Sequence, residues 1–178
     1  IGFQTLKCEI LEKMLGIKKK GRDTQPEHVQ AKALLASQMG RAWNLIGEMH
    51  LSIENKRVQN LPPQDQNLDA YDYTRDAVDA FDKAKEIASK YYLHEIEGVA
   101  NTHIGRIKLA QNDFVNAISC MEAGVAGIKL NITTESKPHL LIEALHALVT
   151  PHLFMENTVE AKIVLEELGK LVAKEPTA

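Results

Sequence analysis

The stretch that decides the fold is NTHIGRIKLAQNDFVNAISCMEAG, residues 101–124. Gly105 and Ala117 stand twelve positions apart in it, on either side of the dipeptide Asn112-Asp113. Asparagine and aspartate at such a point end one helix and cap the next, so the stretch predicts two antiparallel helices joined by a tight turn. Small residues allow two helix backbones to approach closely. We therefore expect Gly105 and Ala117 to form a contact between the two helices.

The composition indicates an ordinary globular protein. The chain has 178 residues, of which 44% are hydrophobic and 25% charged, and this length suits one substantial core or several stacked units. A net charge of -3 provides no global basic field for nucleic acid or an anionic membrane. No apolar run approaches the roughly 20 residues of a membrane span. Two cysteines are too few for a disulfide framework, which favours a reducing compartment, and we predict a cytoplasmic location.

Helical periodicity runs through almost the whole chain, and strand signals are nearly absent, so we predict an all-α fold. The pattern predicts about seven helices, at residues 3–14, 26–57, 68–92, 94–110, 114–131, 138–155 and 158–174. The stretch LPPQDQNLD, with two adjacent prolines, predicts a flexible loop near 58–68. We divide the chain into an N-terminal helix with a basic linker, residues 1–22, and a helical repeat domain, residues 23–178.

Three helix pairs share one pattern, in which a small residue on the second helix is followed four positions later by a large one. The central pair has Gly105, Ala117, Met121 and Gly124. The first pair has Trp43, Ile46, Gly47, Ala77, Phe81 and Ala84, and the third has Leu145, Leu148, Val149, Ala161, Leu165 and Leu168. An isolated pair cannot bury its apolar face, so we expect the pairs to stack.

This pattern resembles the tetratricopeptide repeat, whose signature is W-x-x-L-G-x-x-Y followed by A-x-x-x-F. Trp43-x-x-Ile46-Gly47 matches the opening, with His50 where tyrosine is usual, and Ala77-x-x-x-Phe81 matches the second helix. The resemblance covers residues 40–174 and implies an α-solenoid of stacked antiparallel helix pairs. The repeats are elongated, like those of regulatory helical domains in bacterial signalling proteins. We expect His50 to be a packed core residue.

The resemblance also implies a binding groove lined by the first helix of each pair. The residues expected to face it are Arg41, Asn44, Glu48, Thr102, Arg106, Leu109, His146 and Thr150. The alternative is that they form merely the solvated faces of those helices. The family's carboxylate clamp for acidic C-terminal tails is not matched, because Glu48 and Glu143 would repel such a tail.

No residue pattern in the chain predicts catalysis or a cofactor. Glu143-x-x-His146 has the spacing of a di-iron ligand pair, but the chain has no second copy of it. The spacing of His139, His146 and His152 does not place two imidazoles on one metal ion, so we predict no metal site. Glycine-rich phosphate loops and nucleophile elbows are also absent from the sequence. We expect a non-enzyme without cofactors.

The most consistent reading is therefore a scaffold module that binds a protein or peptide, as part of a larger protein. Two alternatives stay open. One is a regulatory domain that senses an effector or a signalling peptide. The other is a structural module that oligomerises through its N-terminal helix, which belongs to no complete pair.

Overall fold

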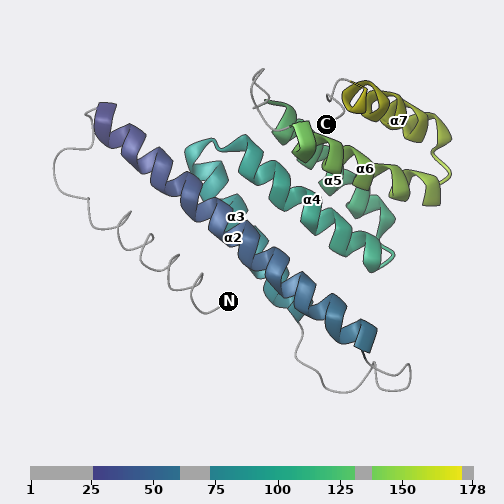
Figure 1. Cartoon of the computed structure of the whole chain (residues 1–178), viewed down its shortest axis with the longest axis horizontal. Coiled ribbons are helices and arrows are strands. Elements are labelled where there is room, and N and C mark those ends of the chain that lie inside the picture. Colours follow the sequence, from purple (N-terminus) through teal and green to yellow (C-terminus); the bar gives the residue numbers. More distant parts are fainter. Residues whose placement is uncertain (1–25, 61–72, 131–137, 174–178) are drawn as a thin grey trace. The chain divides into compact units, whose positions relative to one another are not determined.

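The computed structural model describes residues 26–60, 73–130 and 138–173, and in these ranges all regular structure is helical (Figure 1). The six helices are α2 (Pro26–Asn60), α3 (Tyr73–Tyr91), α4 (His94–Ala110), α5 (Phe114–Leu130), α6 (Pro138–Phe154) and α7 (Thr158–Val172). The prediction of an all-α fold of packed helix pairs is confirmed.

The predicted helix bounds hold to within a few residues from α4 onwards. The loop predicted near 58–68 begins too early, because α2 continues as helix to Asn60. The rest of that predicted loop, residues 61–68, lies outside the described residues. The helix expected at residues 3–14 and the N-terminal region 1–22 also lie outside them. The chain divides into two compact units, residues 1–93 (unit 1) and 94–178 (unit 2).

In unit 1, α2 and α3 pack as an antiparallel pair through Gly47 and Phe81. A Cβ atom at Gly47 would lie 2.6 Å from the Phe81 ring, so the ring packs directly on the α2 backbone. Phe81 is fully buried, as are Ala77 and Ala84 one turn away on either side. Trp43 is buried one turn before Gly47, and the Lys83 ammonium lies 4.2 Å from the centre of its ring. The pattern expected for the first pair is therefore present.

His50 links the middle of α2 to the first turn of α3. Its Nδ1 atom lies 3.8 Å from Oδ2 of Asp76, and its ring centre is 6.1 Å from that of Tyr73. Only 12% of the His50 side chain is exposed. The residue is packed in the pair, as its place in the sequence pattern predicts.

In unit 2, α4 and α5 form the closest helix pair, and glycines on both helices make the contact. A Cβ atom at Gly98 would lie 2.6 Å from the carbonyl oxygen of Gly124 and 2.8 Å from the amide nitrogen of Ile128. At Gly105 it would lie 3.0 Å from the carbonyl oxygen of Ala117 and 2.5 Å from Cγ of Met121. The expected Gly105–Ala117 contact is confirmed.

The turn between α4 and α5 is built by Asn112 and Asp113. Asn112 has φ 59°, the left-handed conformation that ends helices and that asparagine tolerates better than most residues. The Asp113 amide donates to the carbonyl oxygen of Lys108 at 2.9 Å, and its own carbonyl accepts the amide of Ala117 at 2.9 Å. The dipeptide thus ends one helix and starts the next, as predicted.

The second half of unit 2 packs α6 between α5 and α7 (Figure 1). Its core joins Met121 and Ile128 of α5 to Leu145 and Leu148 of α6. In α7 the pattern departs from expectation, because Leu165 is 49% exposed whereas Val164 is buried. Among the described helices α7 packs mainly on α6 and touches α5 through the Lys129–Glu167 ion pair, so fewer of its positions are covered than in α5, which packs on both α4 and α6.

We predict that Gly47→Ala destabilises the protein by about 1–3 kcal/mol, because the new methyl group overlaps the Phe81 ring. Phe81→Leu removes that ring and makes room for the methyl group. The double variant should therefore be more stable than the two single changes predict by addition, by about 0.5–3 kcal/mol. Urea unfolding followed by circular dichroism measures all three values, and strict additivity would contradict the contact.

Candidate functional site

The first helices of the two pairs in unit 2, α4 and α6, are direct neighbours. An ion pair joins them, with Nη1 of Arg106 2.8 Å from Oε1 of Glu143. The two side chains are 34% and 53% exposed, so the pair lies at the surface. The ion pair shows that Arg106 on α4 and Glu143 on α6 lie on one exposed face of unit 2.

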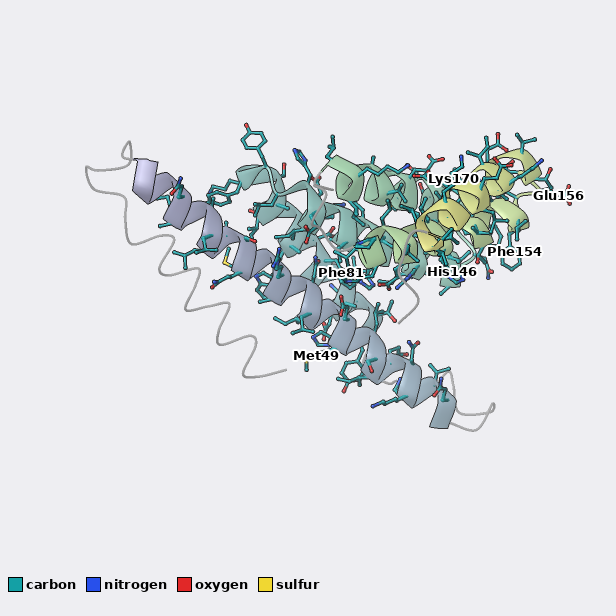
Figure 2. All side chains as sticks on the ribbon, turned by 45° about the horizontal axis from the view of Figure 1, so that its top comes forward. Met49, Phe81, His146, Phe154, Glu156 and Lys170 are labelled. Carbon is teal, nitrogen blue, oxygen red and sulfur yellow. The ribbon has the colours of Figure 1, made fainter. Side chains whose placement is uncertain are left out.

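His146 and Thr150 extend that face along α6. They follow Glu143 by three and seven residues, a spacing that places all three on one stripe of a helix, and both are exposed. His146 is labelled on α6 in Figure 2. We call Arg106, Glu143, His146 and Thr150 the α4/α6 face. It carries one positive charge, one negative charge, an imidazole and a hydroxyl group.

The structure buries Thr102 and partly buries Leu109, the other two residues of α4 that were expected to face the groove. Thr102 is only 5% exposed, and its hydroxyl donates to the carbonyl oxygen of Gly98 at 3.0 Å. A Cβ atom at Gly124 would collide with that hydroxyl, so Thr102 fills the contact with α5. Leu109 is partly buried and packs against the core of α5 and α6. Neither side chain belongs to the α4/α6 face.

On α2, in unit 1, the residues expected to face the groove are likewise partly buried in the helix pair and partly exposed. Asn44 is 5% exposed, whereas Arg41 and Glu48 are exposed. In the repeat pattern Glu48 corresponds to Arg106, since Glu48 directly follows Gly47 and Arg106 directly follows Gly105. Asn44 corresponds in the same way to Thr102, and both are buried. In both pairs the residue just after the glycine reaches the surface, and the one three positions before the glycine does not.

Sequence reasoning did not predict the Arg106–Glu143 pair. It considered Glu143 only at a clamp position and in a Glu-x-x-His pattern, and in neither case as the partner of an arginine on the neighbouring first helix. The available signal was the placement of opposite charges on successive first helices, at Arg106 and Glu143. This signal becomes specific only when the distance between those helices is known.

In the described part of the chain no group of three or more histidine, cysteine, aspartate or glutamate side chains is placed to hold a metal ion. None of the described helices is long and apolar enough to cross a membrane. Comparison of the chain with protein-family models, curated proteins and solved structures gave no match.

We predict that reversing one charge of the pair, Glu143→Arg, lowers the free energy of unfolding by about 0.2–1 kcal/mol, the range of exposed ion pairs. The exchange of both charges, Arg106→Glu with Glu143→Arg, should recover most of that loss. Both effects should shrink in high salt, which screens exposed charges. Thermal unfolding at two salt concentrations measures this. If the double exchange is no more stable than Glu143→Arg, the two residues do not interact.

Proposed function

We propose that this protein is a binding module of the tetratricopeptide-repeat type and that a protein or peptide partner binds on the α4/α6 face. The observation that carries the proposal is the exposed Arg106–Glu143 pair, which bridges two neighbouring first helices. A polar surface formed by successive first helices is the arrangement that the repeat resemblance implies for ligand binding. We further propose that the module works in the cytoplasm, because two cysteines are too few for a disulfide framework.

The glycine contacts beneath this face favour binding because they hold α4 in place. Gly98 and Gly105 let the backbone of α4 lie directly against α5, so a shift of α4 towards α5 would bring their atoms into overlap. A surface that is ordered before binding loses little conformational entropy when the partner arrives. The α4/α6 face would therefore bind an extended or helical segment without a large rearrangement.

The charges of the face indicate the chemistry of the partner. The guanidinium of Arg106 offers several donors in a planar fork that suits a carboxylate. An exposed ion pair contributes little to stability, so a partner carboxylate can replace Glu143 at Arg106 at small cost. Glu143 would then accept a basic group of the partner. We propose a segment with neighbouring acidic and basic residues as the ligand.

Peptides selected from a random displayed library on the immobilised full chain provide the test. The dissociation constant of each selected peptide is measured by fluorescence anisotropy for wild type and variants. We expect Arg106→Ala and Thr150→Arg each to weaken binding by at least about tenfold, as truncation or obstruction at the centre of an interface does. Glu122→Ala, an exposed carboxylate on α5, serves as the matched control and should leave binding unchanged.

Two outcomes would contradict the proposal. One is that selection yields no peptide that binds in solution. The other is that selected peptides bind equally well to wild type, Arg106→Ala and Thr150→Arg, since the partner would then use another surface. Circular dichroism of each variant confirms that the helices are retained.

A further inference from the structure

Two histidines stand on either side of Glu143 along α6. His139 precedes it by four residues and His146 follows it by three, and these spacings put all three side chains on one stripe of the helix. All three are exposed. The Glu143 carboxylate therefore has an imidazole one turn away on each side of it along α6, and it also has the Arg106 guanidinium of α4 at 2.8 Å.

A third histidine lies next to Arg106 on α4. The two helices α4 and α6 run in the same direction, because each is antiparallel to α5. The tight turn after α4 reverses the chain into α5, and the start of α5 meets the end of α6, where the rings of Phe114 and Phe154 stack. His103 precedes Arg106 by three residues, which places it at about the level of His139, and it is half-buried.

The charged side chains of α5 and α7 pair with one another. Lys129 of α5 lies 2.7 Å from a carboxylate oxygen of Glu167 on α7. The short turn after α6 makes α7 antiparallel to it and brings Glu166 to about the level of His146. Glu166 lies 4.0 Å from the Lys162 ammonium on its own helix. Neither Glu166 nor Glu167 shares a helix stripe with His146, as Glu143 does.

The histidines make the charge of this surface depend on pH. Histidine is the side chain whose charge ordinarily changes between about pH 5 and 8, so an imidazole is mostly neutral at about pH 7.5 and mostly positive at about pH 5.5. Opposite charges three or four residues apart on a helix attract one another, and the order in which the acid comes first, as in Glu143 and His146, is the better one. Charged imidazoles on α6 therefore compete with Arg106 for the Glu143 carboxylate.

We propose that a fall in pH converts the α4/α6 face from a neutral surface into a cationic one that binds acidic partner segments more tightly. This inference rests on the proposed function of the face and adds its regulation. At neutral pH the charges of Arg106 and Glu143 cancel, whereas His139 and His146 together add about two positive charges in mild acid. Arg106 is then released to a partner carboxylate, which stays ionised at about pH 5.5.

The selectivity of the face changes with its charge. At neutral pH Glu143 is available to a basic group of the partner, which favours a segment with both acidic and basic residues. In mild acid the two imidazoles hold Glu143, and the face favours carboxylates alone. His146 contributes most to this change, because it follows Glu143 in the favourable order.

The test measures how tightly the full chain binds a fluorescein-labelled hexaglutamate peptide, by fluorescence anisotropy at about pH 7.5 and about pH 5.5 at one ionic strength. For wild type the dissociation constant should be about three- to thirtyfold lower in mild acid, as two exposed charge contacts of ordinary strength provide. The double variant His139→Gln with His146→Gln keeps polar side chains that do not take up a proton. It should bind the peptide alike at both pH values.

His94→Gln is the matched control, since it removes a histidine of α4 that lies twelve residues, or about 18 Å along the helix, from Arg106. It should retain the pH dependence of wild type. Circular dichroism at both pH values confirms that the helices of each protein are retained.

Three results would overturn the inference: no measurable binding of hexaglutamate by wild type at the lower pH, equal binding at both pH values, or an unchanged pH dependence in the double variant. The binding face itself is judged separately, from peptides selected at neutral pH and their affinities for wild type and Arg106→Ala. A missing pH effect therefore leaves the proposed function standing, whereas equal binding of those peptides to the two proteins overturns the face.

Discussion

The direct contact of the α4 and α5 backbones is the constraint on which unit 2 depends. Gly98 on α4 and Gly124 and Gly127 on α5 have no space for a Cβ atom. A Cβ atom added at Gly127, for example, would lie 2.7 Å from the carbonyl oxygen of His94. Two helices this close exclude water from a long strip of backbone, and dispersion contacts along it accumulate. Met121, Val125 and Ile128 of α5 pack with residues of α6 in the core of unit 2. The placement of α6, and with it the α4/α6 face, follows from this first contact.

A close helix contact at a glycine also occurs in unit 1, with different residues. Gly47 receives the Phe81 ring, and Gly105 receives the Met121 side chain, at equivalent positions of the repeat pattern. In the third pair the glycine is replaced by Val149, which is partly buried, and the corresponding Leu165 is exposed. The two glycine-containing pairs are more extensively packed than α6 with α7.

The sequence was sufficient to predict the helices, their order and most of the buried positions, because periodicity and turn residues are local signals. Asn112-Asp113 marks a helix boundary whatever surrounds it. The sequence was not sufficient to predict features that depend on the distances between helices. Thr102 appears polar and surface-directed in sequence, yet it is buried because Gly124 leaves a space that its hydroxyl fills. Pro62 indicated only that α2 ends before it, since a proline does not determine at which earlier residue the helix ends.

The α4/α6 face is polar and carries both charges, which suits the selective and reversible peptide contact that we propose for it. Arg106 on this face belongs to the helix whose backbone lies directly against α5 at Gly98.

A comparison of Gly98→Ala with Gly169→Ala tests this dependence most directly, by urea unfolding of the full chain. Gly169 lies in α7 and has no neighbouring atom within 4 Å of an added Cβ atom. There the change should raise the free energy of unfolding by about 0.5–1 kcal/mol, since alanine favours helix over glycine. Gly98→Ala should instead lower it by about 1–3 kcal/mol, because the methyl group meets the backbone of α5. If Gly98→Ala is as stable as wild type or more stable, the helices do not depend on that contact and the account is wrong.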